Sequence, residues 1–158
     1  QNLIEPIDFY ITDETKMKLS KEDKQQLIFN DLNEIINKIL DNNNYLIIIY
    51  PWPEMENNIP RSIYKSYYYK LLGVEDKNSL TVTHELFKKR QIEVLKFYDK
   101  INHPNLIKIK PDDIFCFEGI CKSTDKFGYF YSDSYHLNDY GSSFISSKIV
   151  ENIKGLND

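Results

Sequence analysis

Six consecutive apolar residues, Tyr45 to Tyr50, constrain the fold more than any other stretch of the sequence. A strand without alternating polar residues is buried on both faces, which is typical of a parallel sheet covered by helices. The strand ends at Pro51, and Pro51 and Pro53 hold the chain extended because they cannot donate ladder hydrogen bonds. Ligands of open α/β sheets bind just beyond the carboxyl ends of strands, so Trp52 and Glu54 are candidate substrate-binding residues.

Helical and extended patterns alternate along the rest of the chain. The expected elements are a short extended piece at 7–11, helices over 20–41, 61–72 and 83–101, a parallel strand at 106–110, a short strand at 129–131 and a final helix. The expected caps are Ser20, Gly73, Thr81 or Thr83, and Asn138. The final helix has one apolar face, made by Tyr140, Phe144, Ile145, Ile149 and Ile153. This order predicts an α/β class with a parallel sheet, and we expect residues 1–158 to form a single domain.

The number of strands is small for such a sheet. The strand at 106–110 alternates and belongs nearer an edge, and the extended run at 129–131 is short. Two parallel strands and one short addition cannot bury both faces of the Tyr45–Tyr50 strand. We therefore expect the chain to be the back part of a larger α/β domain whose front strands lie outside it.

Asp133 and His136 lie in the loop between the last extended run and the final helix. A carboxylate that accepts a hydrogen bond from one imidazole nitrogen fixes the tautomer and leaves the other nitrogen free to take a proton from a nucleophile. Loops between rigid elements commonly carry catalytic residues. The alternative is a structural loop whose His is merely hydrogen-bonded, because an Asp three residues before a His is common by chance in a chain of this composition.

Composition and charge exclude some classes of function. The net charge is −4 with a pI near 5.4 and scattered Lys and Arg, which argues against nucleic acid as the main partner. The longest apolar run is far shorter than the roughly 20 residues that a spanning helix requires. The start of the sequence has no charged-then-apolar leader. We expect either a cytosolic chain or a piece of a larger protein that supplies its own targeting.

Cys116 and Cys121 allow three interpretations. A disulfide across a tight turn comes first and would indicate an oxidising compartment. Two free buried thiols come second. A zinc site comes last, because both cysteines and His136 would still need a fourth ligand such as His103. We therefore expect no metal centre.

The sequence around the Asp–His pair resembles a known family. Tyr131-Ser-Asp133-Ser-Tyr-His136-Leu137, followed by Gly141, is similar to the last conserved block of the SGNH hydrolase superfamily. It resembles more narrowly the SGNH domain at the C-terminus of acyltransferase family 3 membrane proteins, the O-acetylases of O-antigen and surface polysaccharides. Further features of that group are present in order: Pro51, Pro53, Glu54 and Pro60, then Arg90, then the pair Cys116 and Cys121.

This resemblance implies a three-layer α/β/α, flavodoxin-like fold and transfer of an acyl group, with acetyl as the expected group, to a cell-surface polysaccharide through an acyl-serine. His136 would be the general base, Asp133 would orient it, and no cofactor would be needed. The Gly-Asp-Ser block and the oxyanion donors of the family are not found here, so another segment would supply them. The expected partners are an acyl donor, the polysaccharide and a membrane acyltransferase domain upstream, and the expected location is periplasmic or extracytoplasmic. The alternative is a non-catalytic glycan-binding or structural α/β module, with Trp52 stacking on sugar rings.

Overall fold

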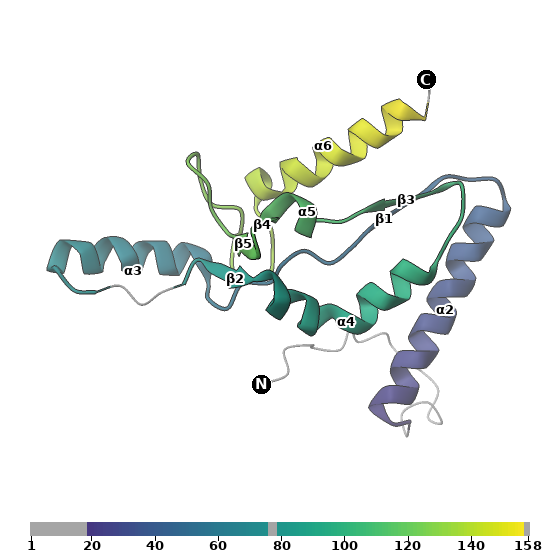
Figure 1. Cartoon of the computed structure of the whole chain (residues 1–158), viewed down its shortest axis with the longest axis horizontal. Helices are drawn as coiled ribbons and strands as arrows, with labels where there is room; N and C mark the ends of the chain where they lie inside the picture. Colours follow the sequence, from purple (N-terminus) through teal and green to yellow (C-terminus); the bar gives the residue numbers. More distant parts are fainter. Residues whose placement is uncertain (1–18, 76–78, 157–158) are drawn as a thin grey trace. The chain divides into compact units, whose positions relative to one another are not determined.

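The computed structural model describes residues 19–75 and 79–156, and it divides the chain into two compact units, 1–44 and 45–158, each of which is treated by itself. The first unit contains α2, Lys21–Asp41 (Figure 1). Ser20 caps this helix, since its Oγ accepts a hydrogen bond from the Asp23 N–H at 3.1 Å. The predicted helix over 20–41 is thus confirmed, whereas the expected extended piece at 7–11 lies outside the described residues. The expectation that residues 1–158 form a single domain stays a prediction.

The second unit contains the predicted parallel pair. Strand β1, Leu46–Ile49, pairs with β3, Leu106–Ile109, with Leu46 opposite Leu106. Ile48 is buried in β1, but Ile49 is 37% exposed. The exposure of Ile49 agrees with the expectation that the strands in this chain are too few to bury both faces of β1, since its sheet has two strands among the described residues.

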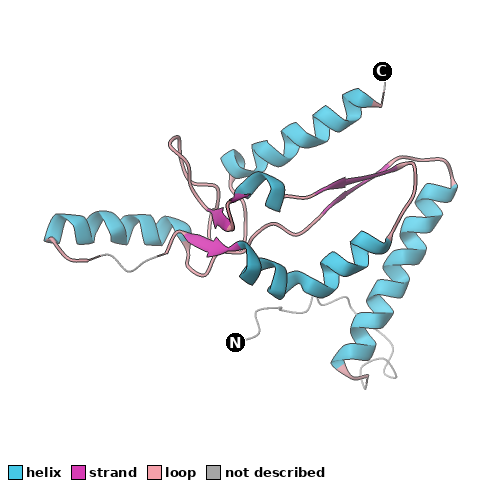
Figure 2. Ribbon diagram, viewed as in Figure 1, coloured by secondary structure: helices cyan, strands magenta, loops and turns pink. Residues whose placement is uncertain are grey.

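A three-stranded antiparallel sheet was not expected from the sequence. Its order is β2-β5-β4, with bounds Thr81–Thr83, Ile120–Lys122 and Cys116–Phe117 respectively. The segment that contains Cys116 and Cys121 is thus a hairpin, preceded by the short helix α5, Asp112–Phe115. Figure 2 shows the small strands between the helices. The mixture of helices and strands places the chain in the α/β class.

Three further helices begin or end at their expected caps. Helix α3, Ile59–Leu72, ends at Gly73, whose φ of 66° is left-handed and favours glycine. Helix α4, His84–Lys100, is capped by Thr83, and α6, Asp139–Gly155, is capped by Asn138. No helix in the described ranges 19–75 and 79–156 is long and apolar enough to cross a membrane.

The expected strand at 129–131 does not form. Isolated bridges join Thr124 to Tyr129 and Tyr131 to Leu137 instead. Each bridge matches a single pair of residues, so the run has no continuous strand partner to extend it.

The aromatic core of the second unit lies beside this run. Its buried members are Met55, Ile59, Val82, Phe115, Cys121, Phe130, Tyr131 and Ile145. The predicted apolar face of α6 packs against this cluster through Tyr140, Phe144 and Ile149, whereas Ile153 is 45% exposed. The core therefore joins the segment after β1, the antiparallel sheet and the first turns of α6, and the Asp133–His136 loop emerges from it.

Candidate active site

The loop that carries Asp133 and His136, residues 131–137, is closed by backbone hydrogen bonds. The Ser132 N–H donates to the His136 carbonyl at 2.8 Å, and the Ser132 hydroxyl donates to the same oxygen at 3.1 Å. Just outside the loop, the Asn138 N–H donates to the Phe130 carbonyl at 2.8 Å. We refer to residues 131–137 as the site loop. Its ends are held together by backbone groups, to which the Ser132 hydroxyl adds one hydrogen bond.

Both carboxylate oxygens of Asp133 accept hydrogen bonds within the site loop. Oδ1 accepts from the backbone N–H groups of Tyr135 at 2.6 Å and His136 at 2.8 Å. Oδ2 lies 2.6 Å from Nδ1 of the His136 ring. The structure therefore brings the predicted catalytic residues into direct contact and fixes the carboxylate by its own turn.

The hydrogen bonds from His136 lower the pKa of Asp133 to about 2, with the backbone N–H contributing most and the ring next. An ionised carboxylate only accepts hydrogen bonds, so Nδ1 of His136 carries the hydrogen in the arrangement that the network favours. The His136 side chain is 74% exposed, and its Nε2 has no hydrogen-bond partner among the described residues. The ring thus presents Nε2 to solvent, on the side where a general base would meet its substrate.

The segment that follows β1, residues 51–59, supports the site loop from one side. Four hydrogen bonds join them: Trp52 Nε1 to Tyr135 O (2.6 Å), Met55 N to Ser134 O (2.9 Å), Ile59 N to Asp133 O (3.3 Å) and Tyr131 OH to Pro53 O (2.6 Å). Trp52, predicted to bind substrate, therefore holds the site loop through its indole N–H. The Asp133–His136 pair therefore lies just beyond the carboxyl end of β1.

Helix α4 supports the 51–59 segment in turn. Arg90 Nη2 donates to Glu56 Oε1 at 3.1 Å, and Gln91 Nε2 donates to Glu54 Oε1 at 3.4 Å. Partial burial raises the pKa of Glu54, and the nearby Arg90 charge opposes that rise. Glu54, the other predicted substrate-binding residue, is thus a half-buried carboxylate beside the site loop.

The cysteines form the disulfide that the sequence favoured. Cys116 and Cys121 face each other in the register of β4 and β5, and their sulfurs are bonded at 1.97 Å. Neither sulfur is available as a zinc ligand. No group of three or more His, Cys, Asp or Glu side chains in the described parts of the chain could hold a metal ion.

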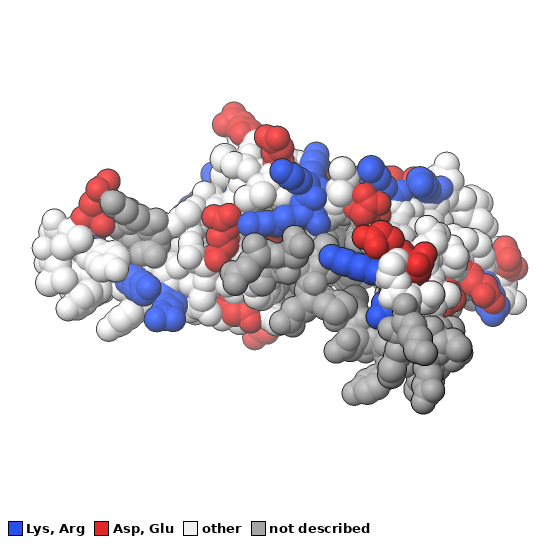
Figure 3. Space-filling view, turned by 90° about the horizontal axis from the view of Figure 1, so that it is seen from below, with Lys and Arg blue, Asp and Glu red and all other residues white. Residues whose placement is uncertain are grey.

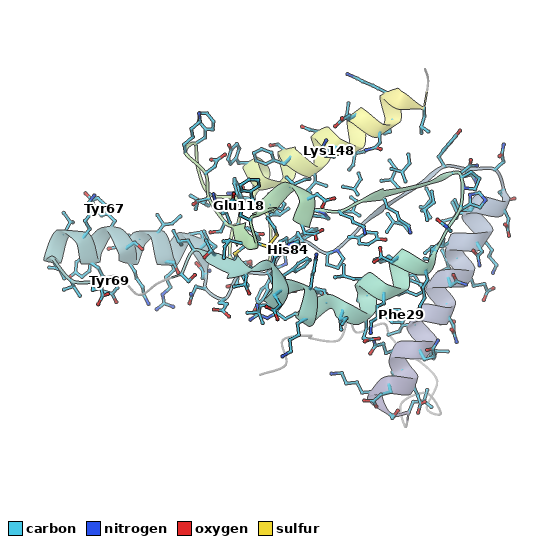
Figure 4. All side chains as sticks on the ribbon, in the orientation of Figure 1. Phe29, Tyr67, Tyr69, His84, Glu118 and Lys148 are labelled. Atoms are coloured by element: carbon cyan, nitrogen blue, oxygen red, sulfur yellow. A yellow bond between two sulfur atoms is a disulfide. The ribbon has the colours of Figure 1, made fainter. Side chains whose placement is uncertain are left out.

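A second Asp–His pair was missed. Nε2 of His84, a residue labelled in Figure 4, lies 2.8 Å from Oδ2 of Asp112. The side chains of His84 and Asp112 are 25% and 11% exposed respectively. The His84 N–H donates to the Gly119 carbonyl at 2.9 Å. The pairing of β2 with β5 brings the hairpin to the start of α4. No local spacing indicates this pair, since its partners are 28 residues apart.

A comparison with protein families agrees with this geometry. The family model described as SGNH domain (fused to AT3 domains) matches residues 4–151. The chain belongs to this SGNH family. No curated protein and no solved structure matches the chain. Fusion to AT3 domains indicates a membrane acyltransferase as the partner domain of an SGNH domain of this kind.

Proposed function

We propose that this SGNH chain is the C-terminal part of an O-acyltransferase domain that transfers an acyl group, acetyl in the simplest case, to a hydroxyl of a cell-surface polysaccharide. The observation that carries the proposal is the 2.6 Å contact between Asp133 Oδ2 and His136 Nδ1, with Nε2 exposed. That arrangement is the base half of a Ser-His-Asp triad. The missing half is a serine, which we place in a segment outside this chain.

The reaction has two acyl-transfer steps. In the first, Nε2 of His136 takes the proton of the serine hydroxyl as its oxygen attacks the carbonyl carbon of the acyl donor, and the leaving group departs with that proton. In the second, Nε2 takes the proton of a sugar hydroxyl, whose oxygen attacks the carbonyl carbon of the acyl-serine; the bond to the serine oxygen breaks, and that oxygen departs with the proton. Asp133 holds the ring and stabilises the imidazolium in both steps. Water in place of the sugar gives hydrolysis as a side reaction.

Within ranges 19–75 and 79–156, β1 and β3 pair only with each other, and the outer edge of each supports the rest of the proposal. Additional strands pairing there would complete a three-layer α/β/α domain and bring the serine and the oxyanion donors to the carboxyl end of β1. Trp52 and Glu54 would then line the substrate site. The Cys116–Cys121 disulfide suits a periplasmic or extracytoplasmic location, where disulfides persist.

The test uses the chain alone and the complete protein. We expect the chain alone not to turn over p-nitrophenyl acetate, because one base without a nucleophile and oxyanion donors loses most of the rate enhancement. Turnover by this chain that His136→Ala abolishes would contradict the placement of the serine. In the complete protein, His136→Ala should lower polysaccharide O-acylation by roughly 10²–10⁴-fold. A complete protein without a Gly-Asp-Ser block would instead favour a non-catalytic glycan-binding module.

A further inference from the structure

One face of α3 exposes an unusual run of large side chains. Tyr64, Tyr67, Tyr68 and Leu71 recur at i, i+3, i+4 and i+7 and are 70%, 65%, 50% and 67% exposed respectively. That spacing forms one stripe along a helix and normally faces a core. We call these four residues the α3 stripe. Figure 4 shows Tyr67 and Tyr69 on opposite sides of the helix, so Tyr69 lies away from the α3 stripe. Contiguous exposed apolar surface of this kind marks an interaction site.

The charges on α3 have one sign. Arg61, Lys65 and Lys70 are its charged residues, and the helix contains no Asp or Glu, although the whole chain has a net charge of −4. At about 100° per residue, Arg61 and Lys65 lie on one side of the stripe and Lys70 on the other. Among the described residues, none of these cations forms an ion pair with a carboxylate. The end of the view in Figure 3 where α3 lies is mostly uncharged surface.

We propose that the α3 stripe lies in the interface of a lipid bilayer that contains anionic lipids. A helix with apolar and aromatic residues on one face and Lys and Arg beside them is typical of helices that lie in the plane of a membrane surface. Tyrosine rings place their apolar body toward the acyl chains and their hydroxyl among the headgroups. The flanking cations then meet anionic headgroups.

The charges argue against a second copy of the chain as the occupant. A two-fold contact between two stripes would bring Arg61, Lys65 and Lys70 of one copy toward the same cations of the other, without carboxylates on α3 to compensate. A domain fused to AT3 domains, as the matching family is described, would be tethered to a membrane. The proposal does not depend on the Asp133–His136 pair, so either can fail without the other.

Co-sedimentation of the chain with vesicles tests the proposal. We expect partitioning onto vesicles with about a third phosphatidylglycerol to exceed that onto pure phosphatidylcholine by roughly a hundredfold, from about fivefold per cation. The excess should disappear when the salt concentration is raised to about 1 M, because the Debye length then falls to about 3 Å. Absence of binding to either vesicle would overturn the proposal.

Three double variants separate the contributions. Arg61→Gln with Lys70→Gln should lower binding to the anionic vesicles about thirtyfold and leave the weak binding to neutral vesicles unchanged. Tyr67→Ser with Leu71→Ser should lower binding to both vesicle types by at least about tenfold, because two large side chains no longer enter the interface. The matched control is Phe117→Ser with Phe127→Ser, which removes two aromatic rings that are 70% and 77% exposed outside α3.

The control variant should bind like the unchanged chain, and circular dichroism should show the same helix content for all variants. Equal vesicle binding by all three variants would overturn the proposal. A dimer in light scattering that Tyr67→Ser with Leu71→Ser abolishes, without vesicle binding, would assign the α3 stripe to a second copy instead and would also overturn it.

Discussion

Gly141 in the first turn of α6 offers the sharpest test of how the site loop is held. Its N–H donates to the Asn138 side chain at 2.9 Å as part of the helix cap. A Cβ added at Gly141 would lie 2.2 Å from the backbone carbonyl oxygen of Phe130 and 3.0 Å from its carbonyl carbon. A backbone carbonyl cannot rotate away as a flexible side chain can. Gly141→Ala therefore has to move α6 away from the 130 region or distort the cap.

The expected cost follows from two opposing effects. Overpacking typically costs about 1–3 kcal/mol, and we take the upper end because the clash involves backbone. Alanine in a helix is favoured over glycine by about 1 kcal/mol, which offsets part of this. The net loss in the free energy of unfolding should be about 2 kcal/mol. For a chain of this length, the melting temperature should fall by about 4–8 °C.

Urea or thermal unfolding followed by circular dichroism measures the effect, with Gly155→Ala as the matched control. Gly155 is in the same helix, and an added Cβ there meets no heavy atom within 4 Å. The control should be neutral or slightly stabilising, since only helix propensity changes. If Gly141→Ala were as stable as Gly155→Ala, the close approach of α6 to Phe130 would be refuted.

Four further perturbations address the paired side chains. His84→Ala should lower the free energy of unfolding by about 1–3 kcal/mol, because it leaves the Asp112 carboxylate, in a residue only 8% exposed, without its partner. In the same urea titration, His136→Ala, at an exposed position, should change the free energy of unfolding by no more than about 0.5 kcal/mol. At pH values above the ordinary carboxyl pKa of 3.8, Asp133→Asn should be less stable than the unchanged chain. The difference in stability should vanish as the pH falls through about 2, because the carboxylate of the folded chain is then protonated. A difference that persists below pH 2 would contradict this. Reduction of the disulfide, which spans a sequence separation of 5, should cost about 2 kcal/mol in unfolding measured with and without reductant; no change would show that the turn forms without the bond.

The sequence predicted the elements whose signals are local. The caps at Ser20, Asn138 and Gly73 are side-chain or glycine signals within one helical turn, and all three are confirmed. The contact between Asp133 and His136 is also local, because three residues in a turn cannot separate far. These parts of the fold and site therefore needed no knowledge of long-range packing.

The elements that were missed depend on long-range pairing. Strand β2 has three residues, and only its pairing with β5, nearly 40 residues later in the chain, makes it a strand. The His84–Asp112 contact follows from that same arrangement. The exposure of Ile49, in contrast, agrees with the number of strands expected from the sequence, because two parallel strands cannot bury both faces of β1.

The closure of the site loop has a consequence for how such a domain can change. The hydrogen bonds from Ser132 N to His136 O and from Asn138 N to Phe130 O use backbone atoms that every amino acid except proline provides. The interior of the turn can therefore accept different chemical groups while its two ends stay fixed.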